Sequence, residues 1–243
     1  MILLIDADVT AYQCMTGAQT EVEWDSDTWV LWGDLAKAKT SFDYYLKQYQ
    51  EATEVEDFKL CFTGLENFRK TLSPTYKGNR KGRKPVGYSA LKEWAMDTYP
   101  SFCKPTLEAD DCMGILATKF AGKSIIVTID KDLLTIPGKM YHLSPDGSGE
   151  WKNTDEKEAD YRFLLQALMG DSTDGYSGCP GVGPVGADKL LKKHGAVWKT
   201  VEDAYLKAGL TKEDALMNAR MARILRQEDW DFETETVKLW NPV

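Results

Sequence analysis

Residues 124–132 read Ser-Ile-Ile-Val-Thr-Ile-Asp-Lys-Asp, a short apolar run that ends in two acids. Such a run is typical of a strand buried on both faces. Similar runs occur at 2–5, 58–62 and 139–143, and helical segments are expected at 34–50, 90–98, 109–121, 156–169 and 212–228. Strands that alternate with helices predict an α/β fold, in which helices flank both faces of a mostly parallel, twisted sheet.

Acidic residues recur where these strands end and where helices begin or end. They are Asp6, Asp8, Glu108, Asp110, Asp111, Asp130, Asp132, Asp171 and Asp174. Because the carboxyl ends of parallel strands share one edge of the sheet, we expect these acids to converge. Carboxylates packed together repel one another, so a cluster needs cations, and oxygen ligands favour Mg²⁺ or Mn²⁺. Single acids at helix starts are ordinary dipole partners, so the signal lies in their combination.

The chain has a net charge of −8, yet residues 67–92 contain no acid at all. This stretch is rich in Pro and Gly and has little periodicity, so we interpret 69–89 as a mobile or arched segment. Lys77 and Arg80 are positioned to contact phosphates, and Tyr76 offers a ring on which a base could stack. The remaining basic residues with the same expected role are Arg69, Lys81, Arg83 and Lys84.

A glycine-rich stretch, Gly178-Cys-Pro-Gly-Val-Gly-Pro-Val-Gly-Ala187, lies between two expected helices, the second of which ends at His194-Gly195. It is no dinucleotide-binding motif, because a helix precedes it. It fits a helix-hairpin-helix, in which Gly181, Gly183 and Gly186 allow backbone N–H groups to approach a phosphate. Lys189 and Lys192 would add positive charge. The alternative is a plain turn between two helices with a solvated lysine face.

The bulk properties restrict the class of protein. Five scattered cysteines without C-x-x-C spacing indicate reduced, intracellular thiols rather than structural zinc. No apolar run approaches the roughly 20 residues of a membrane span, and the N-terminus lacks the basic region of a signal peptide. We therefore expect a cytoplasmic protein of one domain, 1–243, with a core at about 1–170.

Four motifs follow one another in a telling order: Tyr-Lys-Gly-Asn-Arg at 76–80, Glu-Ala-Asp-Asp at 108–111, Asp-Lys-Asp-Leu-Leu at 130–134, and Gly-Asp-Ser-Thr-Asp at 170–174 with Pro-Gly-Val-Gly at 180–183. This set resembles the 5′→3′ exonuclease/flap endonuclease family, most of all the phage exonucleases and the nuclease domain of bacterial DNA polymerase I. The resemblance extends from Asp6 to about Gly195.

The resemblance implies a PIN-like core, an arch region at 69–100, a helix-hairpin-helix subdomain at about 160–195 and a C-terminal helical segment at 196–243. One Mg²⁺ would lie around Asp6, Glu108 and Asp110, and a second near Asp130, Asp132, Asp171 and Asp174, with Asp111 between them or in the outer shell; Mn²⁺ could substitute. Lys77 and Arg80 would polarise the scissile phosphate, so that the catalytic set is Lys77, Arg80, Asp6, Asp110 and Asp132. The hairpin would bind duplex DNA and a K⁺ ion.

Three departures from the family pattern stand out. The family usually has an Asp where the second strand ends, whereas this chain reads Phe-Thr-Gly-Leu-Glu at 62–66, so that either Glu66 substitutes or the first metal is weaker. Gly175 stands where Asn is common. The arch is also compact for a fully closed one.

The resemblance implies a monomeric hydrolase that cuts DNA at 5′ ends, flaps or nicks, and RNA in RNA–DNA hybrids, in phage replication, primer removal or host-DNA degradation. One competing interpretation is a haloacid-dehalogenase-type phosphatase built on Asp6-Ala-Asp-Val-Thr10, but that leaves the arch and the hairpin unexplained. The other is a DNA-binding scaffold without catalysis, which gains nothing from repulsive acids.

Overall fold

The central feature is a six-stranded sheet in the order β5-β4-β1-β6-β7-β8. The computed structural model describes residues 1–80, 82–144 and 148–242. All neighbouring strands are parallel except β8, which runs antiparallel to β7. The strands are β1 (Ile2–Asp6), β4 (Phe58–Phe62), β5 (Ser101–Cys103), β6 (Ser124–Thr128), β7 (Gly138–Leu143) and β8 (Gly149–Thr154). The predicted mostly parallel sheet is confirmed.

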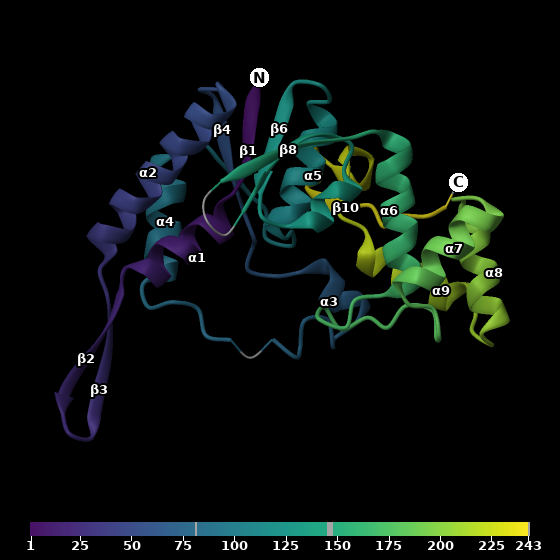
Figure 1. Ribbon diagram of the computed structural model, residues 1–243, viewed down its shortest axis with the longest axis horizontal. Helices are drawn as coiled ribbons and strands as arrows, with labels where there is room; N and C mark the ends of the chain where they lie inside the picture. The colour runs from purple at the N-terminus through teal and green to yellow at the C-terminus, as the bar shows by residue number, and fades with distance from the viewer. Residues whose placement is uncertain (81, 145–147, 243) are drawn as a thin grey trace.

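Side chains of the central strands alternate between two hydrophobic cores. In β1, Leu3 and Ile5 enter one core, whereas Leu4 enters the other, as the period of two in a strand requires. The first core is covered by α1 (Ala7–Gly17), α2 (Leu35–Thr53) and α4 (Tyr88–Thr98), and the second mainly by α5 (Ala109–Lys119). Figure 1 shows these helices on opposite sides of the sheet.

A third core lies beside the sheet and unites four helices (Figure 1). They are α6 (Glu156–Met169), α7 (Pro184–His194), α8 (Trp198–Lys207) and α9 (Lys212–Ala222). Leu168, Leu191 and Tyr205 are buried there, and the Tyr205 hydroxyl donates to the carbonyl of Ala167 at 2.7 Å. None of the helices in the described part of the chain has the length and apolar character of a membrane span.

Two expectations about single elements differ from the structure. The helix expected at 212–228 ends at Ala222, because residues 223–226 run on without helix and carry Ile224 and Leu225 into the second core. Short 3₁₀ turns follow at Gln227–Asp229 and elsewhere at Lys131–Thr135, and a small ribbon joins β9 (Trp230–Asp231) to β10 (Thr236–Val237). Among the described residues of the arch segment, α3 (Phe68–Leu72) is the one helix before α4 begins.

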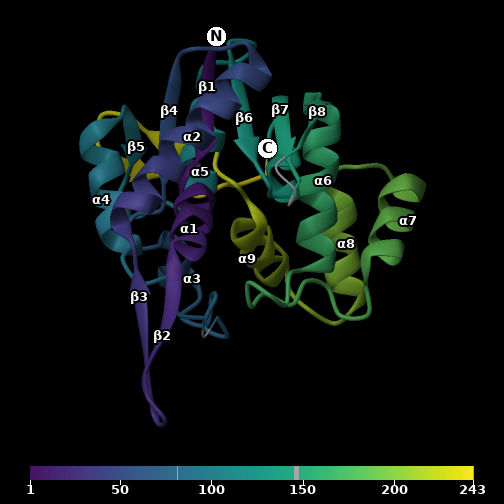
Figure 2. The ribbon, with the colours of Figure 1, turned by 60° about the vertical axis from the view of Figure 1, so that its left-hand side comes forward.

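An antiparallel ribbon of β2 (Gln19–Asp25) and β3 (Thr28–Gly33) was not anticipated from the sequence. It projects away from the body in both views (Figures 1 and 2). Neither of its faces packs on a core, so the ribbon shows no simple alternation of buried and exposed residues.

Candidate active site

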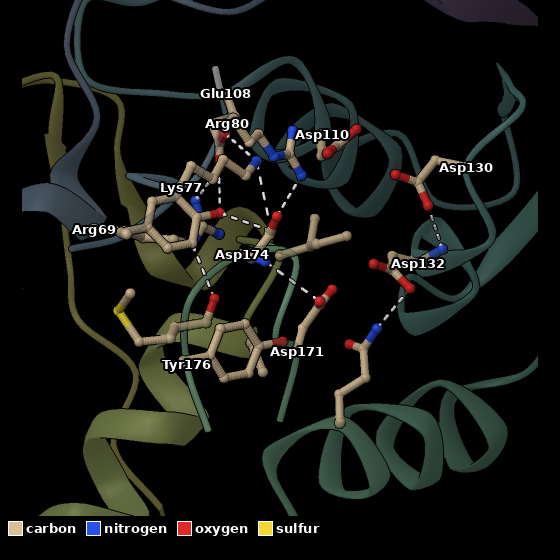
Figure 3. A pocket seen from close by; sticks show the side chains of 15 residues that line it. Arg69, Lys77, Arg80, Glu108, Asp110, Asp130, Asp132, Asp171, Asp174 and Tyr176 are labelled. Atoms are coloured by element: carbon tan, nitrogen blue, oxygen red, sulfur yellow. Dashed lines mark hydrogen bonds and ion pairs between the residues drawn. The ribbon is translucent and has the colours of Figure 1, made fainter. Parts of the chain in front are cut away.

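Six of the predicted acids line one cavity of about 120 Å³ at the carboxyl edge of the sheet. They come from the start of α5, the turn after β6 and the loop after α6 (Figure 3): Glu108, Asp110, Asp130, Asp132, Asp171 and Asp174. Asp6, at the end of β1, is buried nearby rather than exposed to this cavity. The expected convergence of the acids is therefore present.

The Thr128 hydroxyl connects two of these acids. It donates to Asp6 Oδ2 at 2.9 Å and accepts from the Asp130 backbone N–H at 3.0 Å. Asp6 Oδ1 caps α1 by accepting from the Val9 N–H, and Asp130 Oδ1 accepts from the Asp132 N–H. These bonds fix the carboxylates without supplying a counter-charge.

One side of the cavity carries acids with no cation beside them. No described Lys, Arg or His forms an ion pair with Asp6, Asp110, Asp130, Asp132 or Asp171. Burial and the neighbouring Asp8 raise the pKa of Asp6 to about 7. Burial, Asp130 and Asp171 raise the pKa of Asp132 to about 6, and burial with Asp6 raises the pKa of Asp110 well above its usual range. Raised pKa values of this kind mark a site that would gain from a cation.

The other side of the cavity is neutralised by the arch segment. Lys77 Nζ lies 2.5 Å from Glu108 Oε1 and 3.6 Å from Asp174 Oδ2, and Arg80 pairs with Asp174. Burial would raise the pKa of Glu108, but Arg69 and Lys77 together hold it below its ordinary value. Lys77 therefore has carboxylate partners in the folded chain, although no acid lies near it in the sequence.

Arg69 was expected to contact DNA, but its side chain is only 3% exposed in this structure and is engaged by protein groups. Its guanidinium makes two parallel bonds of 2.8 Å to Asp111, a third bond to Glu108, and bonds to the carbonyls of Met221 and Arg223. Asp111 is fully buried and also accepts from the Leu225 N–H at 3.1 Å. Asp111 is thus a partner of Arg69, which disfavours its expected place between the two metals and agrees with a place in the outer shell.

The expectation that Tyr76 stacks on a base is also corrected. Tyr76 is 3% exposed, and its hydroxyl donates to Glu108 Oε2 at 2.8 Å and to Asp174 Oδ2 at 3.2 Å. The ring therefore packs into the site and orients two acids instead of presenting a free face.

The tip of the arch segment rests on the loop after α6. The Lys77 N–H donates to the Asp174 carbonyl at 2.8 Å, and the Asn79 amide donates to the Ser172 carbonyl at 3.0 Å. A Cβ on Gly175 would lie only 3.0 Å from the Thr75 carbonyl oxygen, and Gly175 has a φ of +84°. Glycine at this position thus permits the close approach of the arch.

Three residues that contact the predicted acids were not themselves predicted from the sequence: Gln166 lines the cavity, whereas Tyr88 and Lys92 contact Asp8, which does not line it. Gln166 of α6 donates to Asp132 Oδ1 at 2.7 Å. Tyr88 and Lys92, one turn apart on α4, lie beside Asp8: the Tyr88 hydroxyl donates to Asp8 Oδ1 at 2.6 Å, and Lys92 Nζ lies 4.0 Å from the same atom. An i, i+4 pair after the arch was the available signal.

Glu66 does not replace the missing Asp at the end of the second strand. It is exposed and does not line the cavity. Thr63 follows β4 instead, and its N–H donates to Asp8 Oδ2 at 2.9 Å. The carboxylate closest to this strand end is therefore that of Asp8, supplied by α1.

The glycine-rich stretch forms a tight connection between α6 and α7. Gly170 and Gly178 pack against each other, since a Cβ on Gly170 would lie 2.4 Å from the Gly178 nitrogen. Gly181 has a φ of +76°, whereas Gly183 and Gly186 face open space or an ordinary contact. Lys189 is exposed, and Lys192 pairs with Asp188 at 2.8 Å.

The remaining basic residues with an expected DNA contact lie on the arch segment. Arg83 and Lys84 are exposed there, and Lys81 lies outside the described residues.

The donor set fits a divalent cation in its chemistry, because it consists of carboxylates without counter-charges. Within the described ranges, no three acidic, His or Cys side chains already surround a single point. The acids instead lie around the wall of the cavity, and Lys77 and Arg80 engage Glu108 and Asp174 (Figure 3).

Comparison with solved structures supports the fold. The phage T5 5′-exonuclease with bound zinc superposes with a TM-score of 0.64 at 17% identity, covering 91% of this chain and 88% of that one. The catalytic core of Rad2 in complex with a DNA substrate superposes with a TM-score of 0.51 at 16% identity, covering 86% and 64%.

Sequence comparison gives nearer relatives. The N-terminal, resolvase-like domain of 5′-3′ exonucleases matches residues 1–162. The exonuclease of Escherichia phage T7 is 32% identical, over 99% of this chain and 93% of that protein, and the exodeoxyribonuclease of Enterobacteria phage T3 is 31% identical over the same shares. Because the family's domain covers most of the chain and these relatives align along nearly all of it, the protein belongs to the 5′-3′ exonuclease family.

Proposed function

We propose that this protein is a Mg²⁺-dependent 5′→3′ exonuclease and flap endonuclease that hydrolyses DNA phosphodiesters at 5′ ends, flaps and nicks. The observation that carries the proposal is the cavity itself, in which half-buried acids without ion-pair partners face a segment that bears Lys77 and Arg80. Such a site suits a phosphodiester, whose charge needs cations on both sides.

The acids that have no ion-pair partner would hold the metal. Asp110, Asp130, Asp132 and Asp171 face the cavity, and the buried Asp6 supports them through Thr128. When bound, two Mg²⁺ or Mn²⁺ ions would neutralise phosphate charge and acidify a water for in-line attack. Gln166 fixes the orientation of Asp132 by its hydrogen bond.

Lys77 and Arg80 would bind the scissile phosphate and stabilise charge that grows in the transition state. Both cations now pair with Glu108 and Asp174, so a phosphate would have to exchange with these acids. The exposed Arg83 and Lys84 lie further along the same acid-free segment and would contact the DNA backbone.

The hairpin at 178–186 would hold duplex DNA through backbone groups without reading bases, with K⁺ at its carbonyls.

RNA–DNA hybrids are a further proposed substrate. One copy of the chain contains every residue of the site, so a monomer suffices for cleavage. We also propose that the enzyme acts inside the cell, and that residues 1–243 form one nuclease domain with the arch and hairpin as parts of it.

The test is a comparison of substrates with and without Mg²⁺: 5′-labelled flap DNA, nicked duplex, an RNA–DNA hybrid and p-nitrophenyl phosphate. We expect Mg²⁺-dependent release of short 5′ products from DNA and none from the monoester. Monoester hydrolysis with intact DNA would instead support a phosphatase. DNA binding without any cleavage in Mg²⁺ or Mn²⁺ would support a scaffold.

A further inference from the structure

The ribbon of β2 and β3 takes no part in the site described above. Apart from Gln19 and Gly33 at its base, every residue of both strands is exposed. The base is anchored, because Gln19 Oε1 accepts from the Val86 N–H at 2.8 Å and the Asp34 N–H donates to the Ala18 carbonyl. An isolated two-stranded ribbon is marginal in water, so its stability calls for additional packing.

Large apolar side chains are concentrated on this ribbon. The exposed ones are Val22, Trp24, Trp29, Val30, Leu31 and Trp32, with Trp24 at 77% and Trp29 at 60%. The register pairs Val22 with Val30 and Thr20 with Trp32, so Val22, Val30 and Trp32 share one face. A contiguous apolar surface of this kind normally marks an interface.

The two edges of the ribbon differ in charge. β2 carries Glu21, Glu23 and Asp25, and the turn carries Asp27, whereas β3 contains no charged residue. Charged residues protect an edge strand against pairing, so β2 is protected and β3 is not. The absence of Lys and Arg from 19–33 also disfavours a phosphate backbone as the partner.

We propose that β3 pairs antiparallel with β3 of a second copy of this chain, which gives a four-stranded sheet in the order β2-β3-β3-β2. A two-fold axis through Val30, perpendicular to the sheet, keeps the apolar faces of both ribbons on the same side. The acids of both β2 strands then lie at the outer edges, far from each other. The pairing also supplies the third and fourth strands that a lone ribbon lacks.

The expected strength follows from the size of the contact. The proposed contact is small, because it joins two six-residue strands, whereas specific interfaces bury about 800 Å² per partner. We therefore expect a dissociation constant on the order of micromolar. The catalytic cavity lies outside the contact, so each copy keeps a complete site.

Sedimentation velocity between about 1 and 100 µM brackets this range. We expect the wild-type mass to rise from one chain to two. Val30→Lys places like charges at the two-fold axis and should keep the protein monomeric throughout. Val22→Lys is the matched control, since it changes the partner of Val30 on the same face but on the outer strand, and it should weaken the dimer less. Both sites are exposed, so circular dichroism and cleavage should stay unchanged.

Three results would overturn the proposal. One is a wild-type protein that stays monomeric at every concentration. Another is a dimer that survives Val30→Lys, or that Val22→Lys weakens equally, which would replace edge pairing with stacking of the faces. The third is a loss of flap-DNA affinity in both variants without a change in mass, measured by fluorescence anisotropy, which would make the ribbon a substrate contact.

Discussion

The two sides of the catalytic cavity use the same residue types in opposite electrostatic states. On the paired wall, Glu108 and Asp174 contact Lys77, Arg80 and the Tyr76 hydroxyl. On the bare wall, no described cation forms an ion pair with Asp110, Asp130, Asp132 or Asp171, and burial and neighbouring acids outweigh the more distant attraction of Lys77 at Asp110 and Asp132.

The two walls differ in what sets the pKa values of their carboxylates. Buried Glu108 keeps a low pKa because cations of the same chain offset the cost of burial. Asp110 and Asp132 instead have raised pKa values, because burial and neighbouring acids outweigh the attraction of Lys77, so a bound cation would stabilise their ionised state. The bare wall should therefore govern metal binding, and the paired wall should govern how the arch contacts substrate.

The largest effect should come from the bare wall. Asp132→Asn keeps a hydrogen-bonding group for Gln166 but removes the charge, so we expect an intact fold and retained DNA binding. Loss of metal assistance should lower the single-turnover rate by about 10³-fold or more. Asp203→Asn, an exposed acid of α8, is the control and should cut normally. Near wild-type cleavage by Asp132→Asn in Mg²⁺ would remove this residue from the metal site.

The second-largest effect should come from Arg69, which lies beneath the paired wall and binds Asp111. Arg69→Met leaves Asp111 buried without its guanidinium, which should cost about 3–5 kcal/mol of unfolding free energy. Urea denaturation measures this loss, and Arg83→Met, on an exposed arginine, should change the midpoint little. An Arg69→Met protein of normal stability but weak DNA binding would restore the expectation that Arg69 contacts DNA.

The sequence predicts which acids line the cavity better than it predicts which of them are paired with a cation. Acids after short buried strands must meet at one sheet edge, so Asp130 and Asp132 were identifiable from the run that precedes them. Arg69 and Asp111 were not identifiable as a pair, because 42 positions separate them and a basic run looks the same whether it is solvated or buried. The ribbon of β2 and β3 was not predicted for a related reason: a strand pair that is exposed on both faces has no alternation of buried and exposed residues.

A smaller effect should come from the cation of the paired wall. Lys77→Ala removes charge that would stabilise the transition state, so the single-turnover rate at saturating enzyme should fall on the order of 10²-fold. Affinity for Mn²⁺, followed by calorimetry, should rise, because the ammonium charge that acts on Asp110 and Asp132 of the bare wall would no longer oppose a bound cation. Lys207→Ala, on the exposed side of α8, serves as the control. An unchanged rate would make Lys77 a structural partner of Glu108 and nothing more.

The smallest effect should arise outside both walls, at the hairpin. Gly183 has a φ of −83°, which any residue adopts, and a Cβ there would meet open space. The folded chain itself therefore has no need of glycine at this position, in contrast to Gly170 and Gly178, where backbone atoms lie 2.4 Å from the added Cβ. If a phosphate approaches the N-terminus of α7, Gly183→Val should block one or two backbone hydrogen bonds. Duplex affinity should then fall on the order of tenfold.

The matched control is Ala208→Val, which adds bulk at an exposed helix end with a similar φ of −80°. Both variants should retain the wild-type circular dichroism spectrum and the wild-type single-turnover rate once enzyme saturates the DNA, because neither wall of the cavity is touched. Equal duplex affinity of Gly183→Val and wild type across a salt titration would mean that this stretch is a plain turn between helices. A fall in the saturated rate would instead mean that the hairpin positions the cavity on the substrate, and the separation between binding and cleavage would fail.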